Sequence, residues 1–135
     1  MVMTTDAQAK NAGRTFLVVD DEDFIRNLLI RLLRQMGAAK IVTASNGVEA
    51  LAHLESAHPD VMLLDLSMPE MGGAELIRRL AERKYTGAII LVSGADQETL
   101  VVAESMAKYR DVRILGYITK PVKPEALTGM LQKLG

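Results

Sequence analysis

Apolar runs alternate with helical patterns along almost the whole chain, and this alternation limits the possible folds more than any other feature. Five short apolar runs are typical of β-strands, and each precedes a stretch whose apolar residues repeat every three or four positions. Strands that alternate with helices need crossover connections, which predict a parallel sheet with helices on both faces. The predicted strands are Phe16–Val19, Lys40–Ala44, Val61–Leu64, Ala88–Val92 and Ile114–Ile118.

Capping and stop signals place helices between these strands. Asn46 suits the N-cap of a helix, with Glu49 three residues further on. Pro124 suits the first turn of the last helix, where its missing N–H costs nothing. A further helix is predicted from Asp96 to Tyr109. The run Ala88–Val92 shows no polar alternation, which indicates a strand buried on both faces.

The size and composition of the chain favour one soluble domain. The 135 residues are 49% hydrophobic, which is enough for a substantial core. We interpret residues 1–13 as a flexible polar N-terminal tail and residues 14–135 as the folded domain. The net charge of −1 gives no support for binding to nucleic acid or to acidic membranes.

The sequence lacks several features of secreted and membrane proteins. It contains no cysteine, which excludes disulfides and thiolate metal sites. No apolar run approaches the roughly 20 residues of a membrane span, and the N-terminus has no apolar signal core. We therefore expect a cytoplasmic protein.

Polar residues follow four of the five predicted strands. Asp20 and Asp21 follow the first strand, Asp65 the third, Ser93 the fourth and Lys120 the fifth. Taken singly, each residue is most simply a turn, a cap or a solvated charge. In parallel α/β sheets, however, ligands bind beyond the carboxyl ends of the strands. The joint placement therefore predicts a site of three carboxylates, a hydroxyl and an ammonium group.

The chemistry of this residue set points to a cation and a phosphate. Three carboxylates within a few Å repel one another, and a divalent cation with oxygen ligands relieves that repulsion. Mg²⁺ fits a site of carboxylates, waters and a phosphate oxygen. It also allows an aspartate to attack phosphorus, because it offsets the repulsion between two anions. Lys120 and the Ser93 hydroxyl would then hold the other phosphoryl oxygens.

Four segments of the chain resemble the signature of bacterial response-regulator receiver domains in two-component signalling. They are Val18–Asp21, Asp65–Pro69, Val92–Gly94 and Tyr117–Pro121, and the likeness covers about residues 14 to 135. The segment Asn46–Leu51 also resembles the second helix of that family. The resemblance implies an α/β, doubly wound, five-stranded parallel sheet of the flavodoxin-like (CheY-like) type, with strand order 2-1-3-4-5.

The resemblance implies how the acidic residues divide their roles. Asp65 would be the phosphoacceptor, charged by a sensor histidine kinase or a phosphotransfer protein. Mg²⁺ would be held by Asp20, Asp21, Asp65 and the backbone carbonyl of Ser67. Lys120 would contact the phosphoryl group.

The resemblance also implies a conformational switch. Ser93 would follow the phosphoryl group inward, and Tyr117 would change rotamer with it. Tyr117 by itself would more often be a packing residue on its strand. The switched surface, the last strand with the helices on either side of it, would then bind a downstream protein that the sequence does not identify. The Lys120–Pro121 peptide bond is expected to be cis.

Two alternatives to a free-standing signalling domain remain open at this point. Residues 108–116 depart from the commonest receiver pattern and resemble receivers fused to EAL-type cyclic-di-GMP phosphodiesterases, so the chain could be the receiver of a larger protein. The other alternative is an aspartyl phosphatase of the haloacid dehalogenase kind. That family needs a second Asp two positions after the nucleophile, where this chain has Ser67. We therefore expect no enzyme of that class.

The remaining charged residues have ordinary interpretations. No neighbour at metal-ligand spacing accompanies either histidine, which predicts surface positions for His53 and His58. A solvated helix face is predicted for Arg78, Arg79, Arg83 and Lys84.

Overall fold

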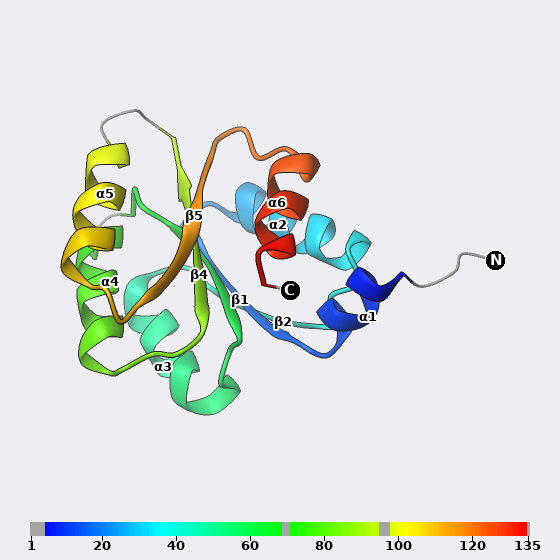
Figure 1. The fold of residues 1–135 in the computed structure, drawn as a ribbon, viewed down its shortest axis with the longest axis horizontal. Coiled ribbons are helices and arrows are strands. Elements are labelled where there is room, and N and C mark those ends of the chain that lie inside the picture. The colour runs from blue at the N-terminus through cyan, green and yellow to red at the C-terminus, as the bar shows by residue number, and fades with distance from the viewer. Residues whose placement is uncertain (1–4, 69–70, 95–97, 135) are drawn as a thin grey trace.

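The computed structural model describes residues 5–68, 71–94 and 98–134 (Figure 1). Five parallel strands form a single sheet in the order β2-β1-β3-β4-β5. This confirms the predicted strand order 2-1-3-4-5. The strands are β1 (Thr15–Val19), β2 (Lys40–Ala44), β3 (Val61–Asp65), β4 (Ala88–Ser93) and β5 (Arg113–Thr119).

Helices cover both faces of the sheet, as the alternating pattern predicted (Figure 1). One face packs against α2 and α6, and the other packs against α3, α4 and α5. Among the described residues, the helices are α1 (Asp6–Ala12), α2 (Asp23–Gln35), α3 (Gly47–Ala57), α4 (Gly73–Glu82), α5 (Glu98–Lys108) and α6 (Pro124–Gln132). The helix predicted from Asp96 to Tyr109 corresponds to α5, and Asp96 itself lies outside the described residues.

Strands β3 and β4 are the most deeply buried strands of the sheet. Every residue of β3 and of β4 is buried, which confirms that β4 has apolar neighbours on both faces. In β1, Leu17 and Val19 face the layer of α3, α4 and α5, whereas Phe16 and Val18 face the opposite layer. Each such buried aliphatic side chain stabilises the fold by about 1.5–3 kcal/mol. These two apolar layers hold the strands, and therefore their ends, in fixed positions.

The local signals at the helix starts are largely confirmed. The side-chain oxygen of Asn46 accepts a hydrogen bond from the Glu49 amide at 2.9 Å, as an N-cap should. The Glu49 carboxylate accepts from the amide of Ser45 at 2.7 Å, one residue earlier than a capping box requires. Pro124 is the first residue of α6, and the Lys120–Pro121 peptide bond is cis.

Of the predicted flexible tail, residues 1–4 lie outside the described residues, whereas Asp6–Ala12 forms a helix. Thr5 and Gln8 form a capping box at its start. Asn11 is buried, and its side-chain amide donates to the Met36 carbonyl at 2.8 Å, which ties α1 to the end of α2. The polar composition concealed this anchor because the Met36 carbonyl lies 25 residues away in sequence.

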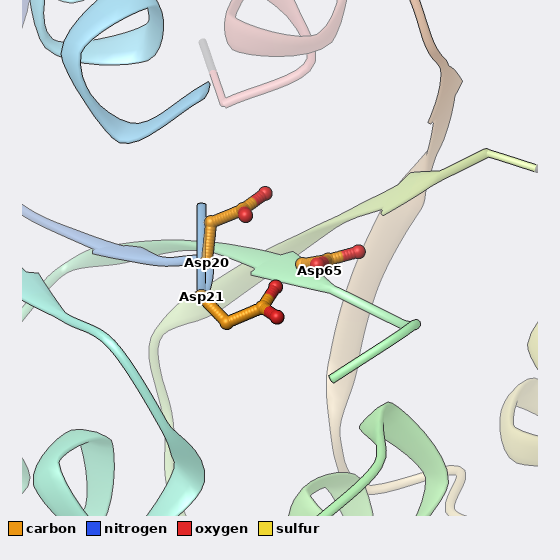
Figure 2. Close-up of side chains that lie close together, drawn as sticks. All are labelled: Asp20, Asp21 and Asp65. Carbon is orange, nitrogen blue, oxygen red and sulfur yellow. The ribbon is translucent and has the colours of Figure 1, made fainter. Parts of the chain in front are cut away.

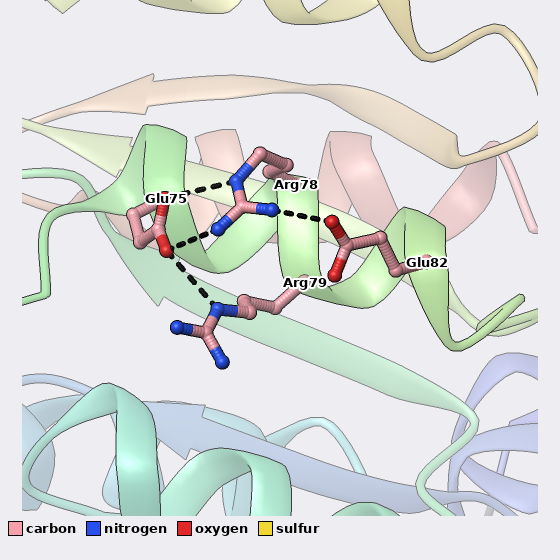
Figure 3. Close-up of polar contacts among 4 residues, drawn as sticks. All are labelled: Glu75, Arg78, Arg79 and Glu82. Atoms are coloured by element: carbon pink, nitrogen blue, oxygen red, sulfur yellow. Dashed lines mark hydrogen bonds and ion pairs between the residues drawn. The ribbon is translucent and has the colours of Figure 1, made fainter.

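Helix α4 carries a ladder of ion pairs on its outer surface (Figure 3). The Arg78 guanidinium donates to both Glu75 carboxylate oxygens and pairs with Glu82, while Arg79 Nε donates to Glu75 at 3.0 Å. Hydrogen bonds from Arg78 and Arg79 lower the pKa of Glu75 to about 2. The predicted solvated helix face is thus present for these two arginines. None of the helices in the described ranges is both long enough and apolar enough to cross a membrane.

Candidate functional site

Three aspartates project from the carboxyl edge of the sheet (Figure 2). Asp20 and Asp21 follow β1, and Asp65 is the last residue of β3. One carboxylate oxygen from each residue lies within 4.8 Å of the other two. Asp20 and Asp65 are buried, whereas Asp21 is exposed. The strand register explains the meeting, since Val19 on β1 is level with Leu64 on β3.

Short turns fix the two buried carboxylates. Oδ1 of Asp20 accepts a hydrogen bond from the Glu22 amide at 2.9 Å, and Oδ1 of Asp65 accepts from the Ser67 amide at 3.1 Å. This bond to the amide two residues later is the usual Asx turn. Each carboxylate therefore has one oxygen held by the local backbone.

Lys120 follows the end of β5 and brings a positive charge to the two buried carboxylates. Its Nζ lies 3.4 Å from Asp65 Oδ1 and 3.5 Å from Asp20 Oδ2. Within the described residues, Asp20 Oδ2 is nevertheless a buried oxygen without a hydrogen-bond partner. One ammonium group thus serves two buried carboxylates and leaves one of their oxygens unsatisfied.

The electrostatics of the site reflect this imbalance. Burial raises the pKa of Asp65, and the charge of Asp20 raises it further, although the Ser67 amide and Lys120 act in the opposite direction. Burial likewise raises the pKa of Asp20. For Lys120, burial acts to lower the pKa, but attraction to Asp65 and Asp20 outweighs it and the pKa is raised. Removing a proton from either buried acid is therefore costly in the protein by itself.

A divalent cation fits this set of donor atoms. The cluster offers three carboxylate oxygens close together, and one buried oxygen lacks a hydrogen-bond donor among the described residues. Hard cations such as Mg²⁺ take oxygen ligands of this kind and relieve the repulsion between them. Ser67 is exposed in the loop after Asp65, and a ligand role for its carbonyl stays a prediction.

Of the two predicted switch residues, Ser93 lies beside Lys120, and Tyr117 lies further from the end of its strand. Ser93 ends β4 and is buried, and its carbonyl accepts from the Lys120 amide at 2.7 Å, so it lies beside the lysine. Tyr117 lies further down β5, level with Leu91, and is 41% exposed. In the part of the chain that the structure describes, no hydrogen bond joins the Tyr117 hydroxyl to the three aspartates.

Arg26 on α2 belongs to the site although the sequence did not single it out. Its Nη1 donates to the Asp20 carbonyl at 2.6 Å, and Nη2 pairs with Asp23. The Arg26 side chain is only 17% exposed. An arginine one helical turn after Asp23 would ordinarily suggest only an ion pair along the helix. Its contact with the Asp20 carbonyl depends on the angle at which α2 leaves β1.

The fold and the site together define a class of protein. A doubly wound sheet of order 2-1-3-4-5, with an acidic cluster and a lysine at its carboxyl edge, is a CheY-like domain of the flavodoxin type. The sequence pattern of the response regulator receiver domain matches residues 16–132. The chain therefore belongs to the response regulator receiver domain family, which acts in two-component signalling.

Individual relatives agree with this family. The chain is 37% identical, over 87% of its own length, to the positive alginate biosynthesis regulatory protein of Pseudomonas aeruginosa, and spans 45% of that protein. It is 30% identical to the chemotaxis protein CheY of Thermotoga maritima, covering 90% of this chain and 98% of that one. The chain thus spans about half of the first relative and nearly all of the second.

Solved structures show the same fold. A signal receiver domain from Bermanella marisrubri superposes with a TM-score of 0.76 at 30% identity, covering 89% of this chain and 96% of that one. A receiver domain protein from Clostridium thermocellum superposes with a TM-score of 0.78 at 24% identity, covering 89% and 92%.

Proposed function

We propose that this receiver domain accepts a phosphoryl group on the carboxylate of Asp65 from a histidine kinase or a phosphotransfer protein. The observation that carries the proposal is the position of Asp65 at the end of the central strand. Its carboxylate lies close to those of Asp20 and Asp21, and Lys120 Nζ is 3.4 Å from Asp65 Oδ1 and 3.5 Å from Asp20 Oδ2. Asp65 is thus close both to carboxylates that could bind a cation and to an ammonium group that could bind phosphoryl oxygens.

The acidic residues and the lysine would have different tasks. An oxygen of Asp65 would bond to phosphorus as the bond from phosphorus to the donor nitrogen breaks. Lys120 would stay paired with the negative charge, now on the phosphoryl oxygens. Asp20, Asp21, Asp65 and the Ser67 carbonyl would hold Mg²⁺, which when bound neutralises charge between the carboxylate and the phosphoryl group. Because Asp21 is exposed, the acidic cluster is accessible from solvent.

The phosphorylated state would be read on the surface of α5, β5 and α6. Ser93 would bond to the phosphoryl group, and Tyr117 would follow it by changing its rotamer. The partly exposed Tyr117 has room to do so. Leu100 and Met106 on α5 are also exposed, at 68% and 47%, and would supply apolar contact area for a downstream protein.

A second arrangement is the same receiver acting as the regulatory module of a longer protein. The 45% coverage of the Pseudomonas relative supports it, because receivers of this sequence type occur in chains about twice as long. The phosphoacceptor chemistry is the same in both arrangements. The cyclic-di-GMP phosphodiesterase that the sequence suggested as an output domain stays a prediction.

The test is to incubate the protein with acetyl phosphate, with Mg²⁺ or with EDTA, and to locate any label by mass spectrometry. We expect one phosphoryl group, on the peptide that contains Asp65, and only with Mg²⁺. A label on another residue would refute the assignment of Asp65. Continuous release of phosphate over many turnovers, without accumulation of labelled protein, would instead favour the phosphatase alternative.

A further inference from the structure

The opposite edge of the sheet holds a second concave site, which has no part in the proposed phosphotransfer. A cleft of about 890 Å³ opens where β1, β3, β4 and β5 begin. Arg14 precedes β1, Asp60 precedes β3 and Arg113 begins β5, and all three line the cleft. A strand of five residues is about 17 Å long, so this cleft and the aspartate cluster lie at opposite ends of the strands.

The cleft has an excess of positive charge, although the chain as a whole has a net charge of −1. Four lysine and arginine side chains line it against two acids. Both acids already have partners. Asp60 Oδ2 accepts a hydrogen bond from the Thr15 amide at 2.7 Å, and Glu55 Oε1 lies 3.7 Å from Arg83 Nη1. Within the described ranges, no ion pair neutralises Lys84 or Arg113.

The backbone of the cleft is unusual at two of its basic residues. Outside glycine, the described residues include two with positive φ, His58 at 47° and Lys84 at 56°, and both line the cleft. They follow the ends of α3 and α4, where glycine is the usual choice for this left-handed conformation. Strained backbone of this kind collects at binding sites more than elsewhere. Here it places two basic side chains around the same cavity.

Helix ends explain only part of this positive charge. The C-terminal end of a helix carries partial negative charge, which attracts basic residues such as Arg83 and Lys84 after α4. Arg14 and Arg113 have no such explanation, because they stand at the starts of strands. The basic residues therefore converge on the cavity from helix ends and strand starts alike.

We propose that this cleft binds a multivalent anion of the phosphate type, held by Lys84 and Arg113 with Arg14 beside them. The apolar part of the lining, from Leu54 and Tyr85, suits an organic group attached to the anion. The Tyr85 ring is fixed, because its hydroxyl donates to the Pro59 carbonyl at 3.0 Å. The site is independent of Asp65, and either one can exist without the other.

The experiment is a calorimetric titration with inorganic pyrophosphate and, separately, with ATP, at low salt and with EDTA present. Lys84→Gly is the most informative variant, because it removes the charge and also relieves the left-handed backbone. Arg113→Gln removes the second charge. Lys40→Gln is the matched control, since Lys40 is exposed at the start of β2 and does not line the cleft.

We expect each cleft variant to weaken pyrophosphate binding about fourfold, as the loss of one charge near an anion in water implies, and the control to leave it unchanged. Lys84→Gly should weaken pyrophosphate binding without lowering the melting temperature of the protein. Tighter binding of ATP than of pyrophosphate would assign the apolar lining to the organic group. Equal weakening by Lys40→Gln, or no binding of either probe, would overturn the proposal.

Discussion

Both edges of the sheet carry acidic and basic residues, but their polar groups are satisfied to different extents. At the carboxyl edge, Asp20 and Asp65 are buried beside one lysine, and Asp20 Oδ2 has no hydrogen-bond partner among the described residues. At the amino edge, the Asp60 carboxylate accepts from the Thr15 amide and the Tyr85 hydroxyl donates to the Pro59 carbonyl.

The two edges therefore contribute to the stability of the fold with opposite signs. Polar groups at the amino edge form bonds that join β1, β3 and the segment before β4, so they stabilise the fold. Acids at the carboxyl edge repel and are desolvated, so they destabilise it until a cation or proton arrives. We infer that the carboxyl edge is shaped for ligands and the amino edge mainly for holding the strands together, with its basic cleft as an addition.

The largest expected effect is loss of labelling in Asp65→Asn. An amide cannot act as the attacking carboxylate, so labelling by acetyl phosphate should fall to background. Asp60→Asn is the matched control, because the amide oxygen can still accept from the Thr15 amide at the other edge. If Asp65→Asn is labelled as well as the parent protein, the contrast between the two edges does not concern phosphotransfer.

The next effect concerns Mg²⁺. Asp21→Asn should weaken Mg²⁺ binding about tenfold or more, because it removes an exposed ligand charge from the cluster. Asp60→Asn should leave the affinity unchanged. Calorimetric titration with Mg²⁺ measures both variants. Equal affinities in Asp21→Asn and the parent would count against Asp21 as a ligand.

A smaller effect is expected on stability without metal. The pKa values of Asp20 and Asp65 are raised above their ordinary value of 3.8, so the folded state binds protons more tightly than the unfolded state. The free energy of unfolding should therefore fall as the pH rises from about 4 through the raised pKa values, and stay low above them. Asp20→Asn should therefore be more stable than the parent at pH 7.

Urea unfolding in EDTA across pH 4 to 8 measures this dependence. The advantage of Asp20→Asn should shrink toward pH 4, where the parent carboxyl becomes protonated, and also in excess Mg²⁺. If the stability of the parent protein instead rises with pH over this range, the buried carboxylates do not destabilise the folded state.

The smallest effect is expected at the amino edge from Tyr85→Phe. The variant removes the donor to the Pro59 carbonyl and should lower the free energy of unfolding by about 1 kcal/mol. Labelling of Asp65 and Mg²⁺ affinity should not change. Thermal unfolding and the labelling assay test the two parts. A loss of labelling in Tyr85→Phe would mean that the two edges are coupled.

Much of this arrangement could be predicted from the sequence, because it depends on local signals. The period of the apolar residues predicted all five strands, and Asn46 and Pro124 marked the starts of helices that the structure contains. The position of each strand end then predicted that Asp20, Asp21, Asp65 and Lys120 would meet. Parallel strands in register make this inference safe without any side-chain detail.

Other features depended on contacts that no local pattern records. The N-terminal segment looked like a tail, since the bond that anchors Asn11 reaches a carbonyl beyond the first strand. Lys84 looked like part of a solvated helix face, but it lies just past the end of α4 and lines a cleft with Arg113. Sequence periodicity does not show which helix ends and strand starts come to surround one cavity.

The sequence by itself determined the order of the elements, the two-layered core and the identity of the residues at the carboxyl edge, because hydrophobic period and residue type are local properties. Only the tertiary structure decided that Lys120 is shared between two buried carboxylates, that Asp20 Oδ2 lacks a hydrogen-bond donor among the described residues, and that Arg26 reaches the Asp20 carbonyl. Those facts depend on distances between segments up to 100 residues apart, and the pKa of a carboxyl group responds to such distances and to burial rather than to its neighbours in sequence.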